Sequence, residues 1–134
     1  MSPYQIHGML QGIVFLILYP LGALIALLRN QIGPSWRPYH VGIQLTASIL
    51  FFIAISIVAY ASYGKPKKES TIRNLHRWNG RLIALLIITQ LFWAYQGRKY
   101  VEWMTWYYVH MSLSASIILL GWTNIYLARM ILKK

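Results

Sequence analysis

Four histidines carry the chemistry that this chain of 134 residues can do, because the sequence contains no cysteine and imidazole is the nitrogen ligand that remains. They are His7, His40, His76 and His110, and they are almost evenly spaced along the chain. Without cysteine, disulfides, iron–sulfur clusters and thiolate zinc sites are excluded. The imidazoles are therefore the nitrogen ligands that a metal could use in this chain.

The segments that must position the histidines are strongly apolar. The chain is 57% hydrophobic and 11% charged, which is too apolar for the surface of an ordinary soluble domain. Its apolar stretches match the roughly 20 helical residues that cross a bilayer, and they predict spans at about 9–28, 41–60, 78–95 and 106–127. Short connections force neighbouring helices to alternate in direction. We expect one all-α domain over residues 1–134, a transmembrane up-down-up-down four-helix bundle with a kink at Pro20.

The formal charge of +11 lies mainly in the segments that flank these spans. This distribution fits lipid headgroups better than nucleic acid. The N-terminus has no basic region and no cleavage site, so the first span is expected to be retained. Segments 31–38 and 64–74 are expected to be surface loops. The face with both termini has nine basic residues against four, which predicts a cytoplasmic or matrix location for the termini. The nine are Lys65, Lys67, Lys68, Arg73, Arg77, Arg81, Arg129, Lys133 and Lys134, and the four are Arg29, Arg37, Arg98 and Lys99.

One histidine stands near the start of each predicted span, so alternating direction predicts the pairs His7 with His76 and His40 with His110. The two levels are about 20 Å apart, which is too far for a single mononuclear site. Two nitrogens are too few for a closed zinc site, whereas haem iron needs only two axial ligands. We therefore predict two haem b groups with these histidines as iron ligands, and no catalytic residue. Bis-histidine ligation leaves no place for oxygen or substrate, which indicates electron transfer.

The residues around the histidines suit a flat cofactor. Small residues let a macrocycle approach the helix, although Gly8 and Gly12 also form a G-x-x-x-G that close helix packing explains as well. Polar side chains one turn after three of the histidines can reach a propionate or a water, and basic side chains can neutralise propionates. The terminal tryptophans and tyrosines are interpreted as interfacial belts rather than electron relays. The small residues are Gly8, Gly12, Gly42 and Gly80; the polar ones are Gln11, Gln44 and Ser114; the basic ones are Arg77, Arg81 and Lys68 on one face and Arg37, Arg98 and Lys99 on the other.

Several of these segments resemble the haem-binding helices of the cytochrome b561 family, especially its DOMON-linked and ferric-reductase-like branch. The resemblance covers nearly the whole chain and implies the same two ligand pairs. It also implies transmembrane electron transfer, often from ascorbate to monodehydroascorbate or ferric iron. We expect neither a flanking span nor a DOMON module in this protein, and the family usually begins this helix on the non-cytoplasmic side, contrary to the charge count that we favour. The matching segments are residues 7–11 with 19–26, residues 35–40 with Gln44, residues 75–81 with Gln90, and residues 106–110 with 121–126.

These observations leave more than one function open. The leading interpretation is an electron conduit, either a stand-alone ascorbate- or ferric-reductase-like oxidoreductase or a subunit of a homodimer or larger redox complex. Its donor and acceptor stay open among ascorbate, a quinone, ferric iron and a protein. The alternative is a haem-free membrane scaffold or assembly subunit. A transporter with histidine proton relays would need ionisable groups near mid-membrane, which the predicted spans lack.

Overall fold

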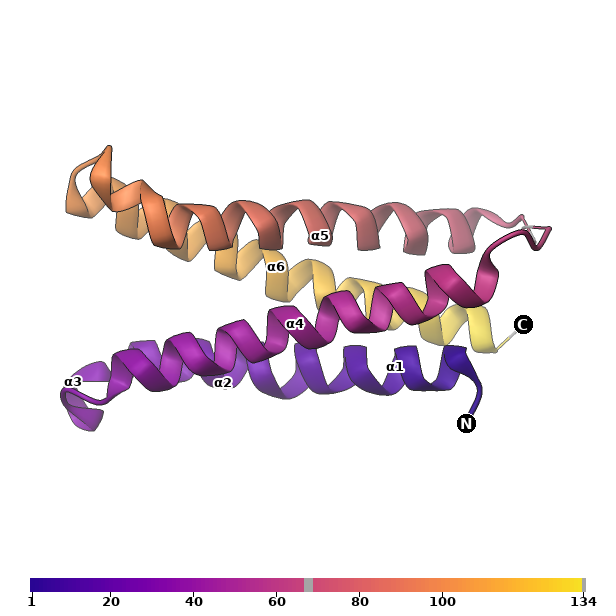
Figure 1. Cartoon of the computed structure of the whole chain (residues 1–134), viewed down its shortest axis with the longest axis horizontal. Helices are drawn as coiled ribbons and strands as arrows, with labels where there is room; N and C mark the ends of the chain where they lie inside the picture. Colours follow the sequence, from indigo (N-terminus) through magenta and orange to yellow (C-terminus); the bar gives the residue numbers. More distant parts are fainter. Residues whose placement is uncertain (67–68, 134) are drawn as a thin grey trace. The chain divides into compact units, whose positions relative to one another are not determined.

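The computed structural model describes residues 1–66 and 69–133, and within these ranges the chain divides into two compact units. Each unit is a helical hairpin (Figure 1), and we call them the first and the second hairpin. The described ranges contain helices and turns and no strand, which confirms the all-α prediction. The arrangement as a single four-helix bundle over residues 1–134 stays a prediction, so each hairpin is described by itself.

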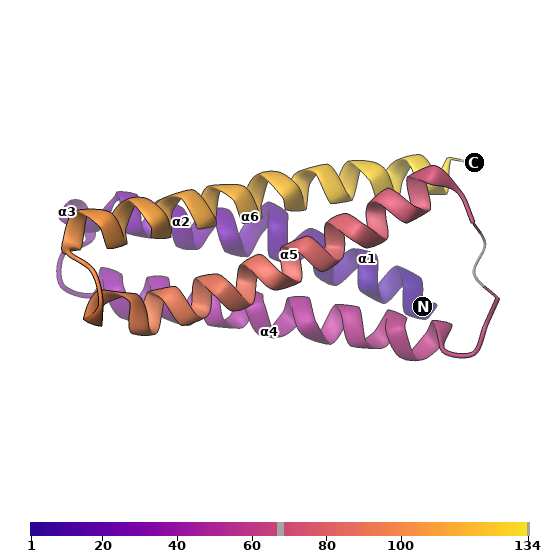
Figure 2. The ribbon, with the colours of Figure 1, turned by 90° about the horizontal axis from the view of Figure 1, so that it is seen from above.

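The first hairpin pairs a long broken helix with a long continuous one. Its outgoing part consists of α1 (Pro3–Ile13), the π-helical turn η1 (Val14–Leu18) and α2 (Tyr19–Leu27) in direct succession. A short helix, α3 (Arg29–Ile32), turns the chain, and α4 (Trp36–Ser62) returns beside both α1 and α2 (Figures 1 and 2).

Polar caps start α1 ahead of the apolar stretch. The Ser2 hydroxyl accepts the backbone N–H of Gln5 at 3.3 Å, and the Gln5 side-chain oxygen accepts the N–H of Ser2 at 2.8 Å. This reciprocal capping satisfies two N–H groups that have no partner within the helix, and Pro3 suits the first turn because it has no N–H to satisfy. As a result, His7 lies inside α1, in its second turn.

The outgoing helix is irregular just before Pro20, where the sequence predicts a kink. The chain forms a π turn just before the proline, in which the N–H of Tyr19 donates to the carbonyl of Val14, five residues back. Pro20 cannot donate a hydrogen bond, and its ring crowds the carbonyl of the residue four positions earlier. Widening the preceding turn accommodates the proline, and both prolines and π turns are common causes of a bend in a helix.

The start of α4 corrects the predicted loop at 31–38. Trp36, Arg37 and Pro38 form the first turn of α4, where Pro38 is tolerated because the N–H groups of a first turn have no helical partner. The reversal itself falls on Gly33, whose φ of +79° is a left-handed conformation that suits glycine.

The second hairpin consists of α5 (Thr71–Gln96), a short 3₁₀ turn η2 (Gly97–Lys99) and α6 (Trp103–Leu132), with α5 and α6 side by side. The Ser70 hydroxyl accepts the backbone N–H of Arg73 at 3.2 Å and caps α5. The predicted polar loop at 64–74 therefore ends at Ser70 rather than at residue 74. Lys67, Lys68 and Lys134, which belong to the basic flanks, lie outside the described residues.

Three described helical stretches are long and apolar enough to cross a membrane: Pro3–Leu27, Trp36–Ser62 and Trp103–Leu132. They contain three of the four predicted spans. Helix α5 is of similar length but is not one of them, because Asn79, Arg81 and Gln90 interrupt its apolar sequence. The span predicted at 78–95 therefore stays a prediction.

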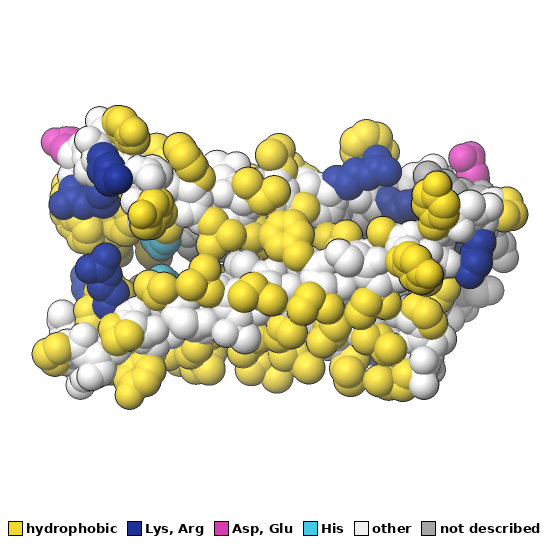
Figure 3. Space-filling view, in the orientation of Figure 1, with side chains coloured by type: hydrophobic (Ala, Val, Ile, Leu, Met, Phe, Trp, Pro, Cys, Tyr) yellow, Lys and Arg dark blue, Asp and Glu magenta, His cyan; other side chains and the backbone are white. Residues whose placement is uncertain are grey.

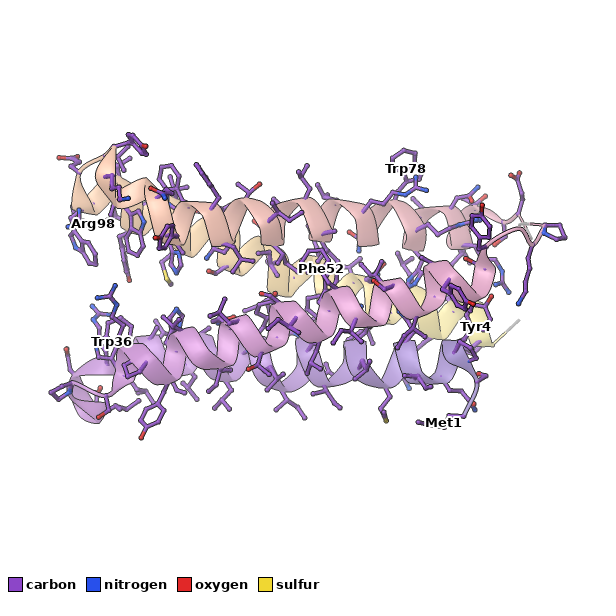
Figure 4. The ribbon with its side chains drawn as sticks, in the orientation of Figure 1. Met1, Tyr4, Trp36, Phe52, Trp78 and Arg98 are labelled. Atoms are coloured by element: carbon purple, nitrogen blue, oxygen red, sulfur yellow. The ribbon has the colours of Figure 1, made fainter. Side chains whose placement is uncertain are left out.

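Many large apolar side chains of these helices are exposed. Leu16, Ile49 and Leu85 are each 60% exposed, and Trp78 projects away from α5 (Figure 4). Figure 3 shows hydrophobic side chains along the visible faces of both hairpins, with Lys and Arg side chains mainly toward the helix ends. Outward apolar surface of this extent needs a lipid or protein cover, since water would leave it unstable.

Candidate functional site

The two histidines of the first hairpin are tied across it to main-chain carbonyls. His7 Nδ1 lies 2.9 Å from the carbonyl oxygen of Ala54 in α4, and His40 Nδ1 lies 2.8 Å from the carbonyl oxygen of Gly22 in α2. Both imidazoles are half-buried. Each helix of the hairpin therefore holds the histidine of the other.

The second hairpin repeats this arrangement in the same register. His76 Nδ1 lies 3.2 Å from the carbonyl oxygen of Asn124 in α6. The separation in sequence between His110 and Asn124 is the same as that between His40 and Ala54. His76 and His110 are both half-buried, like the histidines of the first hairpin.

The residue that contacts His110 has the same place in the second hairpin as Gly22, the residue that contacts His40, has in the first. Gln90 lies against His110. The sequence separation from His76 to Gln90 is one residue shorter than the separation from His7 to Gly22. The π turn η1 accommodates this additional position between His7 and Gly22, so Gly22 and Gln90 occupy equivalent places. The two hairpins are therefore built on one plan.

The carbonyl contacts determine which ring nitrogen can bind a metal. A carbonyl oxygen only accepts hydrogen bonds, so Nδ1 of His7, His40 and His76 is the protonated donor. In the neutral ring the lone pair is then on Nε2, which is the nitrogen that a metal would take. Histidine ligands commonly donate their other N–H to such an acceptor, which fixes the tautomer and the ring orientation.

The two histidines of one hairpin lie at opposite ends of it, about 20 Å apart at the helical rise per residue. His7 and His40 therefore cannot share a ligand, and neither can His76 and His110. Each predicted pair takes one histidine from each hairpin. The pairs themselves stay predictions.

The polar residues one turn after the histidines bond within their own hairpins. The Gln11 amide lies 3.5 Å from the Phe51 carbonyl, the Gln44 amide donates to the Tyr19 carbonyl at 3.4 Å, and the Ser114 hydroxyl donates to the His110 carbonyl at 2.9 Å. The predicted contacts of these side chains with a propionate or a water stay untested.

The glycines near the histidines fall into two groups. A Cβ at Gly8, Gly12 or Gly42 would meet nothing within 4 Å, so the G-x-x-x-G of α1 makes no close contact with the other helices of the first hairpin. A Cβ at Gly80 would lie 3.6 Å from the Asn124 side chain, an ordinary contact. The glycines beside His7 and His40 leave open space on the helix surface, which is compatible with a flat cofactor.

Basic side chains near the helix ends rest on aromatic rings or on their own helix. Arg81 lies over Trp78 at 4.7 Å, Arg98 over Trp103 at 4.9 Å, and Lys99 over Tyr95 at 5.6 Å. Arg77 donates to the Asn74 side chain at 2.7 Å, and Arg37 is exposed on the first turn of α4. Lys68, the remaining predicted propionate partner, lies outside the described residues.

A pair of tryptophans predicted as membrane belts forms a clasp inside the second hairpin. The Trp93 indole N–H donates to the Trp106 carbonyl at 3.1 Å, and the Trp106 indole N–H donates to the Trp93 carbonyl at 3.0 Å. Trp106 also stacks on His110, with ring centroids 4.9 Å apart and planes 12° from parallel. The sequence signal for this contact is that Trp106 and His110 are one helical turn apart.

Among the described residues, no group of three or more His, Cys, Asp or Glu side chains comes together as a metal site. Glu69 is exposed ahead of α5, and Glu102 precedes α6, where its carboxylate accepts the Thr105 hydroxyl at 3.3 Å. A metal site made only of protein ligands usually needs three or more such side chains. A haem iron requires only two protein ligands, so the finding does not apply to haem.

Comparison with known proteins gives one distant likeness. No protein-family model matches the chain, and no solved structure matches it. Over 129 residues the chain is 29% identical to a cytochrome b561 and DOMON domain-containing protein of Arabidopsis thaliana, in an alignment that covers 91% of this chain and 31% of that protein. The chain thus spans less than a third of the length of this relative. With three helices able to cross a membrane, the likeness supports an integral membrane protein distantly related to cytochrome b561 proteins.

Proposed function

We propose that this chain transfers electrons across a membrane through two b-type haems, one held by His7 and His76 and the other by His40 and His110. The observation that carries the proposal is the anchoring of Nδ1 of His7, His40 and His76 on main-chain carbonyls at 2.8 to 3.2 Å. This bond assigns the lone pair to Nε2 and fixes the ring, as an axial ligand requires.

The pairing follows from the helix directions. Within each hairpin the histidines are at opposite ends, so a two-histidine site must combine one residue from each hairpin. If the four long helices cross the membrane in turn, the odd-numbered pair shares one face and the even-numbered pair the other. Two sites at opposite faces would form a path across the bilayer.

The surroundings support a macrocycle at these places. Gly8 and Gly12 beside His7, and Gly42 beside His40, leave the helix surface open. Arg77 on one face and Arg37 on the other are available for propionates. Haem b would supply a one-electron couple when bound, and two imidazoles held by this chain would leave its iron no place for oxygen or substrate. The histidines of this chain would therefore serve to hold and orient the group.

The proposed role indicates only the chemical classes of the electron donor and the electron acceptor. Ascorbate, a quinone, ferric iron and a redox protein are the candidates, and the chain would act as a small oxidoreductase or as a subunit of a homodimer or larger membrane complex. The positive-inside rule places both termini on the cytoplasmic or matrix side. These assignments are part of the proposal.

Visible spectroscopy of the purified chain in detergent tests the proposal. We expect a low-spin spectrum whose α-band sharpens on reduction with dithionite, and two haems per chain by quantitative haem extraction. A colourless protein, prepared from cells supplied with haem, would contradict it.

A haem-free scaffold or assembly subunit is the second candidate. It is favoured by one observation, that His7, His40 and His76 are already hydrogen-bonded within their own hairpins, which satisfies the imidazoles in a membrane interior without a cofactor. The same spectrum separates the two functions, because a scaffold predicts no visible absorption band.

A further inference from the structure

One arginine lies on the outward side of α5. From Trp78 to Gln96, Arg81 is the only charged residue of this helix, and its side chain is exposed. Successive residues of a helix are about 100° apart, so Arg81 lies about 140° around α5 from His76 and nearly opposite Ile83. Ile83 is fully buried. Arg81 therefore faces away from the histidine that its own helix carries.

The surface beside Arg81 is apolar. On the same side of α5, toward the middle of the helix, lie Leu85, Ile88 and Phe92, and each is more than half exposed. Trp78, which lies one turn before Arg81, is equally exposed and projects away from the helix (Figure 4). Acyl chains of lipids would cover these side chains, whereas a guanidinium group beside them needs an anionic partner.

The guanidinium group of Arg81 is held in place but has no carboxylate side chain near it. Its central carbon lies 4.7 Å from the centre of the Trp78 ring, in a cation–π contact. Glu69 precedes the start of α5, about 15 Å away along the helix, and Glu102 lies beyond the turn at the other end, about 24 Å away. The sequence has no other acidic side chain. The anion that Arg81 needs must therefore come from outside this hairpin.

The position of Arg81 along α5 indicates the boundary between hydrocarbon and lipid headgroups. If the turn at Gly97 lies at one surface of the hydrocarbon layer, Arg81 lies about 24 Å from that surface along the helix. The layer is about 30 Å thick, so the Cα atom of Arg81 would lie about 6 Å inside the opposite surface. From there an arginine side chain can extend to the phosphate groups, and an exposed tryptophan is typical of the same level.

We propose that Arg81 and Trp78 bind the phosphate group of an anionic phospholipid, whose acyl chains cover the apolar side of α5. The planar N–H groups of an arginine suit two phosphate oxygens, while the indole ring covers one face of the guanidinium. Arg77 and Arg73 follow at intervals of one turn toward the start of the helix, and their charge favours an anionic over a zwitterionic headgroup. The site does not depend on bound haem.

Quenching of tryptophan fluorescence by brominated lipids tests the proposal on the full-length protein in vesicles. The vesicles contain phosphatidylcholine with a minor share of phosphatidylglycerol, and the bromine is carried either by the phosphatidylglycerol or by an equal amount of the phosphatidylcholine. Subtracting the signal of Trp78→Phe isolates Trp78, and the ratio to vesicles without bromine removes any quenching by haem. We expect brominated phosphatidylglycerol to quench Trp78 about fivefold more effectively than brominated phosphatidylcholine.

Arg81→Gln should abolish most of this preference. Arg98→Gln is the matched control, because it removes an arginine that also lies over a tryptophan, at the other end of the hairpin, and it should keep the preference. Equal quenching of Trp78 by the two lipids in the parent chain, or an unchanged preference in Arg81→Gln, would overturn the proposal. Absence of quenching by either lipid would also overturn it, since a protein surface such as a second copy of the chain would then cover this side of α5.

Discussion

The two hairpins reach the same placement of histidines with opposite distributions of large and small residues. In the first hairpin Gly22 faces the long side chain of Gln44, whereas in the second hairpin Gln90 occupies the place of Gly22 and contacts the small Ser114. Ser114 lies one turn after His110, as Gln44 lies one turn after His40. The long side chain at this crossing comes from α4 in the first hairpin and from α5 in the second.

The opposite ends of the two hairpins also differ in the residues beside the histidine. Gln11 lies one turn after His7 and Gly80 one turn after His76, and the carbonyl that anchors the histidine belongs to Ala54 in one hairpin and Asn124 in the other. The Gln11 amide lies near the Phe51 carbonyl in the first hairpin, whereas in the second hairpin a Cβ at Gly80 would meet the Asn124 side chain. The register between the two helices of a hairpin therefore determines which main-chain carbonyl accepts the histidine N–H. The side chain of that residue can vary, because every residue has a main-chain carbonyl.

The middle sections of the hairpins differ in polarity. The first contains the buried rings of Phe15 and Phe51, in edge contact at 5.8 Å, and a hydrogen bond of 3.0 Å between the hydroxyls of Tyr19 and Ser48. The second is filled by buried aliphatic residues, Ile83, Ile87 and Ile117. The sections between the histidines are therefore free to vary, whereas the ends keep their plan.

The largest expected effect comes from removing one histidine. His76→Ala should lower the haem content from two groups to one per chain, because it deletes one axial ligand of one site and leaves the His40 and His110 site intact. Quantitative haem extraction from the purified variant checks this. Equal loss of haem from both sites would contradict the assignment of His76 to one site only.

A smaller but substantial effect is expected at the tryptophan clasp of the second hairpin. A Cβ at Gly97 would lie 2.9 Å from Cδ2 of Trp93 and 3.1 Å from Cδ1 of Trp106, and rigid indole rings cannot move aside easily. Gly97→Ala should therefore lower the free energy of unfolding by about 1–3 kcal/mol. Thermal unfolding in micelles followed by circular dichroism measures it.

Gly8→Ala is the control for the clasp, since a Cβ there would meet nothing within 4 Å. Its unfolding should stay close to that of the parent chain. If Gly97→Ala unfolds no earlier than Gly8→Ala, the reciprocal tryptophan contacts do not stabilise the second hairpin.

The smallest effect is expected at Gly22. A Cβ there would lie 2.5 Å from Nε2 and 2.9 Å from Cδ of Gln44, but this flexible side chain can withdraw at the cost of its bond to the Tyr19 carbonyl. Gly22→Ala should cost about 1 kcal/mol of unfolding free energy. Adding Gln44→Ser, which copies the small residue of the second hairpin, should recover part of that loss, as a double-mutant cycle would detect. If the two changes in unfolding free energy are strictly additive, residues 22 and 44 do not interact, and the exchange of large and small residues does not affect stability.

The sequence predicted the helices and the place of each histidine, because apolar periodicity and the four imidazoles are visible in the residues themselves. It missed the helix starts at Ser2 and Ser70, since polar caps extend a helix beyond its apolar stretch. It did not predict the π turn before Pro20, because whether that turn widens depends on how α2 packs on α4.

The anchors of the histidines were beyond prediction from residue types. His7 and His40 bond to carbonyls of Ala54 and Gly22, and nothing about alanine or glycine indicates an acceptor for a distant ring. The residue types of Trp93 and Trp106 favour belts, because aromatic residues at span ends usually are. Only the register of α5 against α6 brings each indole to the other's carbonyl.

The most direct test of the central claim is the haem content of two double variants. His7→Ala with His76→Ala removes both ligands of one proposed site, and the chain should keep one haem. His7→Ala with His40→Ala removes one ligand from each site, and the chain should keep none. One retained haem in the second variant would contradict sites built from one histidine of each hairpin.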